Sequence, residues 1–377
     1  MKHYLLIAFL LITLTTDSQV LNPSGILYKE MYFNAFLNFS ENKENYRKNA
    51  YENMYLNDFG TLYSFIGKYD KAIELFTILN KKKGYIPDSL RKIKLKRFGI
   101  KQDSLNKLYK NVNVVMFNEA HHISQHRAFL YSQLEVLKSL GYNQLALEAL
   151  NKEDTLLKER KYPVKSTGFY INDPVYGNVI RKALELGFTL ISYDVYKTFG
   201  REKGEAKNIF KKYNPNKGKL VVYAGYGHIS ETGKWKMMGQ FLNKYLNEDL
   251  LTISQFTPYN VKPEFPSDDN YEFYLMKDAD KQFDYYIYAK PKPSVLNIPY
   301  WYDWMNFETK PLKDIYSESI MYPTLIQILN INEKNAVPVY QYMIEKDENV
   351  LIAFPKTGEY ILKVFDKNGK KEYKVHL

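Results

Sequence analysis

Short apolar runs alternate with helical stretches between residues 111 and 290, and this alternation constrains the fold more than any other feature of the sequence. The runs are rich in Val, Leu, Ile and Tyr and cover residues 112–117, 144–147, 189–193, 219–224, 250–254 and 283–289. The stretch after the first run places Leu130, Leu134 and Leu137 at helical spacing. Apolar strands joined by helical crossovers form a parallel sheet covered on both faces. The sequence therefore predicts a three-layer, mostly parallel α/β domain over residues 111–290.

The regions on either side of this core have different patterns. Residues 19–110 are predicted to be a helical N-terminal region, in which Gly60, Gly67 and Ala72 have the spacing of one tetratricopeptide-like hairpin. A lone hairpin cannot bury its apolar face, so we expect it to pack within the chain or against a partner protein. Residues 291–377 are predicted to be an extension that ends in a small antiparallel β module, with a tight turn at Asn368-Gly369. A short helix is expected near residues 322–326.

The first residues have the three parts of a secretory signal peptide. Lys2 precedes an apolar run over residues 4–14, and polar residues follow through Gln19. A bilayer-spanning helix needs about 20 apolar residues, so this run is too short for a transmembrane anchor. We expect residues 1–18 to be removed and the mature chain to be periplasmic or extracellular.

Composition narrows the chemistry that the chain can perform. Cysteine is absent, which excludes disulfides, thiolate nucleophiles and zinc–thiolate sites. Any metal must be held by His, Asp, Glu or carbonyl oxygen. The net charge of +11 favours anionic partners. For an exported protein we expect a small-molecule or peptide substrate and no nucleic acid.

Ionisable residues follow four of the expected strands. Glu119 and His121 come after the first of these strands, Glu148 after the second, Asp194 after the third and His228 after the fourth. Ligands of parallel sheets bind beyond the carboxyl ends of the strands. The sequence therefore predicts that these side chains meet at one rim. Taken singly, each has an ordinary alternative, because Glu148 or Asp194 could cap a following helix.

The same segments resemble a known superfamily. They are residues 119–127, residues 145–148, Tyr193-Asp194, Arg201-Glu202 with Ala206, and residues 224–228. Over roughly residues 112–290 the chain resembles the superfamily that joins erythromycin esterases to ChaN-like haem-binding proteins and Tiki/TraB proteins. The resemblance implies an α/β fold with an acid–histidine site at the strand ends.

Two details separate this chain from the common pattern. Asn118 stands where most members have Gly before the first Glu. The esterase pattern places a His three residues after Glu119, at His122, whereas the ChaN-like pattern places it two after, at His121, with a further one at His126. Both spacings are satisfied here, and the ChaN-like one more fully. Because extended side chains alternate, His121 rather than His122 is expected to face the same side as Glu119.

These residues predict an exported hydrolase for an ester, lactone or amide. His121 or His228 would take a proton from water, Glu119 or Glu148 would fix the imidazole tautomer, and Arg201 would stabilise an oxyanion. The predicted catalytic set is Glu119, His121, Glu148, Arg201 and His228. The predicted supporting set is His122, His126, Arg127 and Asp194.

Three alternatives remain open. A divalent metal held by Glu119, His121, Glu148 and His228 would lower the pKa of bound water. Esterase-like members argue against a metal and Tiki-like members argue for one. The same cleft could instead bind haem or an anionic small molecule without turnover, although Glu119 and Glu148 would be poor neighbours for haem propionates. In the third alternative the chain is a scaffold that has lost the site.

Overall fold

The protein is described here by a computed structural model that covers residues 22–29, 32–48, 50–83, 98–100, 102–196, 199–255, 271–278 and 281–377. The expected signal peptide, residues 1–18, lies outside these ranges. Within them, no helix combines the length and apolar character that crossing a bilayer requires.

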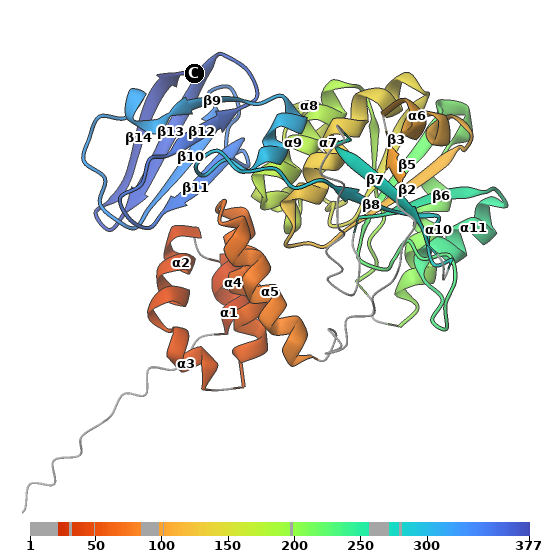
Figure 1. Ribbon diagram of the computed structural model, residues 1–377, viewed down its shortest axis with the longest axis horizontal. Helices are drawn as coiled ribbons and strands as arrows, with labels where there is room; N and C mark the ends of the chain where they lie inside the picture. Colours follow the sequence, from red (N-terminus) through yellow and green to blue (C-terminus); the bar gives the residue numbers. More distant parts are fainter. Residues whose placement is uncertain are drawn as a thin grey trace, which may run out of the picture.

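A central eight-stranded sheet organises the fold (Figure 1). Its order is β1–β7–β8–β6–β2–β5–β3–β4, and β7 is antiparallel to both its neighbours while every other pair is parallel. This confirms the mostly parallel α/β core. The strands are β1 Phe98–Ile100, β2 Val114–Glu119, β3 Tyr142–Leu147, β4 Thr189–Ser192, β5 Lys219–Gly225, β6 Leu250–Ser254, β7 Phe273–Lys277 and β8 Tyr285–Ala289.

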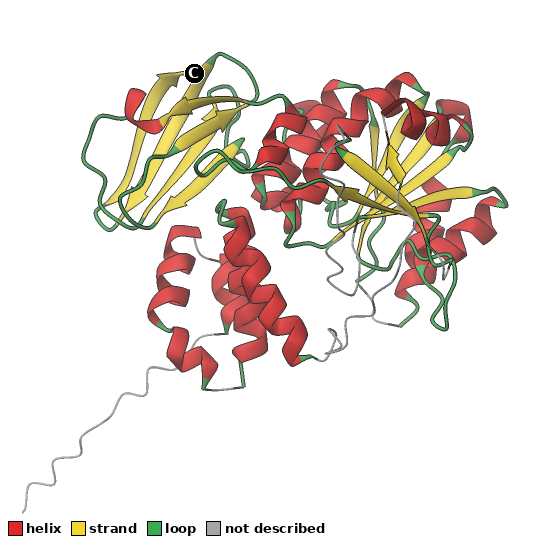
Figure 2. Ribbon diagram, viewed as in Figure 1, coloured by secondary structure: helices red, strands yellow, loops and turns green. Residues whose placement is uncertain are grey.

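Helices cover both faces of this sheet, as Figure 2 shows in red against yellow. Helices α7 (Ser124–Ser139) and α9 (Pro174–Glu185) share a core with Val115 and Phe117 of β2. Val114 and Met116 of β2 point to the other face, where they pack with α10 (Arg201–Lys212) and α11 (Met238–Leu246). The period-two alternation of a fully buried strand thus builds three layers.

Shorter helical segments complete the α/β part and its connection to the C-terminal region. They are α6 Gln102–Lys110, α8 Leu157–Arg160 and the 3₁₀ helices η1 Lys165–Thr167, η2 Tyr170–Asn172, η3 Pro215–Lys217, η4 Tyr300–Met305 and η5 Leu312–Asp314.

The N-terminal region is helical, as expected, and its helices are α1 Pro23–Lys29, α2 Tyr32–Glu41, α3 Lys43–Arg47, α4 Glu52–Phe65 and α5 Tyr69–Lys82. Helices α4 and α5 form a close hairpin, and Gly67 turns the chain between them with a left-handed φ of +77°. A Cβ at Gly60 would lie 2.7 Å from the Phe76 ring, so the helices approach where Gly60 has no side chain. The hairpin is therefore observed, while its tetratricopeptide character stays a prediction.

The C-terminal region contains a four-stranded antiparallel sheet of order β11–β10–β13–β14 and a two-stranded one, β12–β9. Their bounds are β9 Glu308–Pro311, β10 Thr324–Asn330, β11 Tyr340–Ile344, β12 Leu351–Phe354, β13 Glu359–Asp366 and β14 Gly369–His376. Gly369, with φ +124°, closes the predicted tight turn between β13 and β14. The β12 strand pairs with β9 rather than with β13, so the three last strands are not the simple meander expected.

One expected element is wrong. The helix predicted near residues 322–326 is instead the start of β10, which pairs with both β11 and β13. Its apolar run is short and contains β-branched residues. Its backbone groups form hydrogen bonds with two strands that are distant in the sequence, and this pairing outweighs the local preference for a helix.

The three regions pack closely. The N-terminal helices share a core with Leu325, Met343 and Phe365 of the C-terminal sheet, and a second core runs from the α/β sheet into that module. Figure 1 shows the N-terminal helices below the C-terminal sheet and to the lower left of the α/β part. The β1 strand, which falls within the region expected to be helical, belongs to the central sheet through β7. The boundaries at residues 18, 110 and 290 stay predictions.

Candidate active site

The β2 strand ends in a buried carboxylate that an arginine and a histidine share. Arg127, on α7, donates two hydrogen bonds to Glu119. Its Nε donates to Oε2 at 2.7 Å, and its Nη2 donates to Oε1 at 2.7 Å. His121 Nδ1 lies 2.7 Å from Glu119 Oε1. Burial raises the pKa of Glu119, but the charge and hydrogen bonds of Arg127, followed by those of His121, hold it well below its usual value. Glu119 is therefore an ionised acceptor, and the Nδ1 of His121 carries the proton.

A second acid fixes Arg127 from the other side. Arg127 Nη1 donates to Asp173 Oδ2 at 2.6 Å, and both side chains are fully buried. Asp173 is also the N-cap of α9, since its Oδ1 accepts from the amide of Val175 at 2.7 Å. The Glu119–Arg127–Asp173 chain thus ties β2, α7 and α9 together beneath His121.

Glu148, after β3, meets the end of β5. The amide of Gly225 donates to Glu148 Oε2, and Arg201 Nη2 donates to Glu148 Oε1 at 2.8 Å. Burial raises the pKa of Glu148, but its electrostatic interactions with His121, His228 and Arg201 outweigh burial and lower it. Glu148 is therefore held as a carboxylate against the strand end.

Backbone strain collects next to these groups. Ala149, which follows Glu148, has φ +64°, and Tyr226, which follows Gly225, has φ +44°. Left-handed conformations at residues other than Gly cost about 1 kcal/mol or more and concentrate at functional sites. The two strained residues flank the point where Glu148 reaches Gly225.

His121 presents its second nitrogen to this point. A Cβ on Gly225 would lie 2.6 Å from His121 Nε2 and 2.9 Å from Glu148 Oε2, so His121 and Glu148 converge over a strand end that has no side chain. The Tyr170 ring stacks on the imidazole with centroids 4.0 Å apart. His121, Glu148 and Arg201 line a cavity of about 400 Å³. His122, by contrast, does not line this cavity and stacks on Phe76 of α5. Both histidines lie in the turn after β2, so the alternation of an extended strand does not account for their different directions.

Asp194, after β4, lines the same cavity. Its Oδ2 accepts from the amide of Ala149 at 2.8 Å, while its buried Oδ1 has no hydrogen-bond partner among the described residues. Burial, and then the charge of Glu148, raise the pKa of Asp194 to about 7. Near neutral pH this carboxyl therefore holds a proton in a substantial fraction of molecules.

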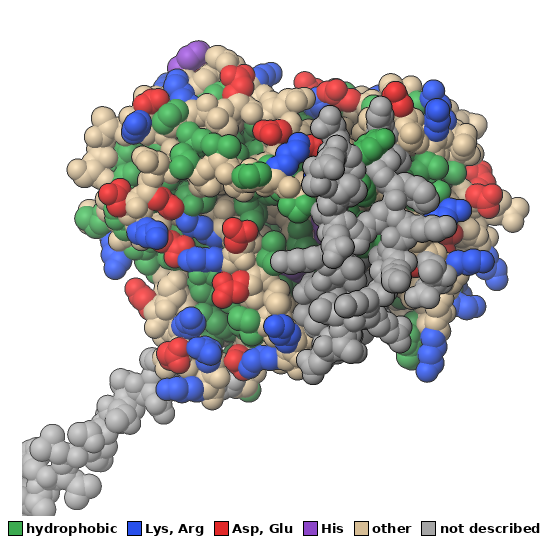
Figure 3. Space-filling view, viewed as in Figure 1, with side chains coloured by type: hydrophobic (Ala, Val, Ile, Leu, Met, Phe, Trp, Pro, Cys, Tyr) green, Lys and Arg blue, Asp and Glu red, His purple; other side chains and the backbone are tan. Residues whose placement is uncertain are grey.

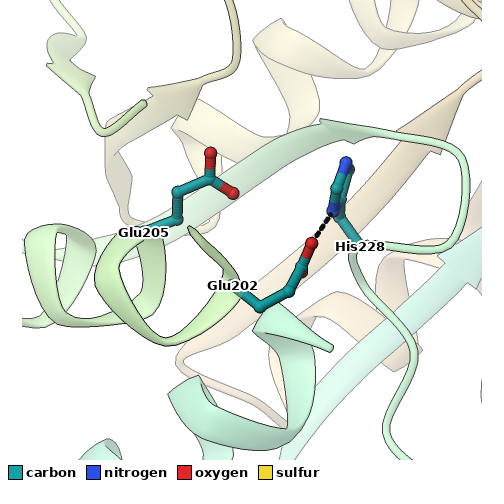
Figure 4. A group of neighbouring side chains, drawn as sticks. All are labelled: Glu202, Glu205 and His228. Carbon is teal, nitrogen blue, oxygen red and sulfur yellow. Dashed lines mark ion pairs between the residues drawn. The ribbon is translucent and has the colours of Figure 1, made fainter. Parts of the chain in front are cut away.

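His228 lies in a different group of side chains, together with Glu202 and Glu205 of α10 (Figure 4). Its Nδ1 lies 2.7 Å from Glu202 Oε1, and its Nε2 lies 3.9 Å from Glu148 Oε1. Burial lowers the pKa of His228, but Glu202 and Glu148 outweigh burial and raise it. Glu205, one turn along α10, accepts from Arg201 Nε at 2.7 Å.

The set able to hold a metal differs from the predicted one. Among the residues that the structure describes, the only group of three or more His, Asp or Glu with ligand atoms within 4.8 Å of one another is Glu202, Glu205 and His228. The oxygens of Glu119 are occupied by Arg127 and His121.

The other two predicted supporting residues, His122 and His126, make contacts that stabilise the fold. His126 Nδ1 accepts from the amide of Ala120 at 3.0 Å, which fixes the turn between β2 and α7. Burial lowers the pKa of His126 to about 4 and that of His122 to about 3. Both imidazoles are therefore neutral in the folded protein at pH 7.

Several residues of the site were not among the predicted catalytic or supporting residues, although Asn118 and Glu202 lie in segments noted from the sequence. Asn118, which replaces the expected Gly, lies in β2 rather than in a turn and binds the carbonyl of Tyr226 and Ser254 Oγ through Nδ2. The others are Tyr170, Asp173, Glu202 and Glu205. Tyr170, Asp173 and Glu205 have no local motif, although the i, i+3 spacing of Glu202 and Glu205 places both on one helix face.

A larger cavity of about 980 Å³ adjoins the site and shares Ala149, Tyr170 and Asp194 with it. Its walls are mainly aromatic and cationic. The aromatic members are Tyr28, Tyr32, Tyr162, Phe169, Tyr170 and Tyr196, and the cations are Arg160, Lys165 and Lys334. On the face drawn in Figure 3, positive and negative side chains are interspersed over the described surface.

No family model and no curated protein matches the sequence. Among solved structures, the chain is similar to ChaN of Campylobacter jejuni with cofacial haem, at 11% identity and a TM-score of 0.37 over 54% of this chain and 100% of that one. It is also similar to the type III effector HopBA1, at 16% identity and a TM-score of 0.35, over 55% of this chain and 100% of that one. A third similarity is to RRSP, a MARTX toxin effector domain from Vibrio vulnificus CMCP6. The identity is 16% and the TM-score is 0.30, over 48% of this chain and 39% of that one. Likenesses of this size assign no family to the chain.

Proposed function

We propose that the protein is an exported hydrolase in which His121 activates water for attack on an ester, lactone or amide. The observation that carries this proposal is the Glu119–His121 pair. An ionised, arginine-anchored Glu119 accepts from Nδ1, which leaves Nε2 of His121 as a base at the wall of the 400 Å³ cavity. A carboxylate that orients an imidazole is the arrangement expected of a general base.

Asp194 supplies the complementary proton. With a pKa of about 7 it donates to the leaving group, while His121 accepts from water. The water oxygen bonds to the carbonyl carbon, and the resulting oxyanion is stabilised by the partly exposed guanidinium of Arg201. Collapse breaks the bond to the leaving group, which departs with the proton of Asp194. The imidazolium then returns its proton to solvent and Asp194 takes one up.

The experiment uses the mature chain purified without a tag and a panel of esters, lactones and amides. The expected result is hydrolysis of at least one class, reduced about 100-fold or more in Glu119→Gln and His121→Gln. The matched control is His376→Gln, because His376 is exposed on β14 and remote from the cavity. Unchanged hydrolysis in His121→Gln, or no hydrolysis by the wild type, would contradict the proposal.

A second candidate is a binding protein that uses the same cavities without turnover. The 980 Å³ cavity with aromatic and cationic walls favours it, since such a space suits a large planar or anionic ligand. His121 Nε2 would be the axial ligand if that molecule were haem. A Soret band on haem addition, abolished in His121→Gln and accompanied by no hydrolysis, would favour this candidate.

A further inference from the structure

The cluster formed by Glu202, Glu205 and His228 contains a buried carboxylate oxygen without a partner among the described residues, which points to a missing ligand. Glu205 has a side chain that is 1% exposed, and its Oε2 has no hydrogen-bond partner among the described residues. Nδ1 of His228 lies 2.7 Å from Glu202 Oε1, on the same side of the cluster. Leaving a buried carboxylate oxygen without a partner is costly. A bound group in this space would satisfy Glu205 Oε2.

The other ends of the two acids are held by the protein. Glu202 Oε2 accepts from the amide of Met238 at 2.8 Å, and Glu205 Oε1 accepts from Arg201 Nε at 2.7 Å. Each carboxylate therefore uses one oxygen for anchoring and leaves the other directed to the cluster. Hydrogen bonds of this kind orient the ligands of metal sites.

The charge of the cluster favours a cation as the missing group. With His228 neutral as a metal ligand, Glu148, Glu202 and Glu205 contribute three carboxylates against the single guanidinium of Arg201. A divalent ion would balance the excess of carboxylates over guanidinium. The ligand atoms lie within 4.8 Å of one another, and ligands of one ion are about 3–4 Å apart, so small side-chain rotations suffice.

We propose that Glu202, Glu205 and His228 bind one divalent transition-metal ion. One imidazole nitrogen and two carboxylate oxygens suit Zn²⁺ or Mn²⁺ better than Mg²⁺, which prefers oxygen and water. The side chains of Glu202 and His228 are 22% and 16% exposed, which leaves an entry path and open coordination positions. This inference goes beyond the proposed function, because His121 acts without an ion in that mechanism.

The test titrates the full mature chain, stripped with EDTA and dialysed, with Zn²⁺ or Mn²⁺ in a calorimeter. We expect about one equivalent to bind, with Mg²⁺ binding much more weakly. Glu205→Gln and His228→Gln should each weaken Zn²⁺ binding about tenfold or more. Matched controls are Glu135→Gln and His376→Gln, since both side chains are exposed and remote. No binding at about 1 mM Zn²⁺, or unchanged affinity in both cluster variants, would overturn the proposal.

X-ray absorption on the Zn²⁺-loaded wild type keeps the test independent of variant folding. The expected coordination shell has one imidazole nitrogen, and a shell with two imidazoles or none would overturn the assignment. Hydrolysis is assayed in parallel. Metal binding without hydrolysis contradicts the proposed function alone, whereas hydrolysis without metal binding contradicts this inference alone.

Discussion

The amide of Gly225 donates to the carboxylate of Glu148 at a point where Gly225 itself has no side chain to exclude the His121 ring. Three strand ends therefore contribute to one contact, and the missing Cβ is part of the geometry. A Cβ would lie 2.5 Å from His121 Cε1, a distance that real structures do not tolerate.

Gly225→Ala should therefore displace His121 and strongly reduce hydrolysis. We expect a destabilisation of about 1–3 kcal/mol from overpacking, together with a loss of activity of about 100-fold or more. The control is Gly227→Ala, where a Cβ would contact only Met237 at 3.9 Å. Urea unfolding and a hydrolysis assay measure the two effects. Equal behaviour of the two variants would contradict the role given to Gly225.

Arg127→Met should destabilise the fold strongly. The substitution leaves two buried carboxylates, Glu119 and Asp173, without their cation, and breaking buried ion pairs in this way costs about 3–5 kcal/mol. Lys82→Met removes an exposed pair with Glu52 and should change stability by less than about 1 kcal/mol. The free energy of unfolding in urea checks both, and a small effect at Arg127 is the result that we do not expect.

Acid should destabilise the protein through its buried histidines. The unfolded chain binds a proton on His126 below about pH 6.5, whereas the folded protein resists until about pH 4. The contribution of His126 to the free energy of unfolding is therefore fully present above pH 6.5. It is lost as the pH decreases to 4, by about 1.4 kcal/mol per pH unit for each such histidine. His122 acts in the same direction, with a folded pKa of about 3.

His126→Asn tests this pH dependence, because Asn can retain an acceptor for the amide of Ala120 but does not titrate. Its stability should fall less steeply than that of the wild type between pH 6.5 and 4. His376→Asn, at an exposed position, should follow the wild-type curve. Identical slopes for His126→Asn and the wild type would show that His126 is not the titrating group.

Hydrolysis should decline above about pH 7, as Asp194 loses the proton that it gives to the leaving group. The charges that face Asp194 are Glu148, Glu205 and Arg201. Asp194→Asn should lower the rate about 100- to 10,000-fold and remove this alkaline decline. Asp303→Asn, on an exposed part of η4, controls for general effects of pH. An unchanged alkaline limb in Asp194→Asn would rule out Asp194 as the acid.

The central sheet could be predicted because its strands are continuous apolar runs, as in Val114–Glu119 and Lys219–Gly225. Strands whose partners are distant could not. Phe98–Ile100 and Phe273–Lys277 are short and pair with each other across more than 170 residues, so no local pattern marks them. The same holds for Thr324–Asn330, whose strand character depends on β11 and β13.

The strand-end residues Glu119, His121 and Glu148 could be found from their positions alone. Glu202 and Glu205 could not, because acids on a charged helix ordinarily face solvent. Only the fold brings α10 beside the turn after β5, where Glu202 and Glu205 lie next to His228. Asp173 was missed for a similar reason, since its sequence signal is that of a helix cap before Pro174.

The Phe76–His122 stack, with centroids 3.8 Å apart, joins α5 to the residue next to the proposed base. A helix from the first quarter of the chain therefore braces the turn that positions His121. Excising residues 22–83 would expose one face of this imidazole and release the turn on that side. The N-terminal helices accordingly support the turn that carries the proposed base, and the α/β core on its own would lack this contact.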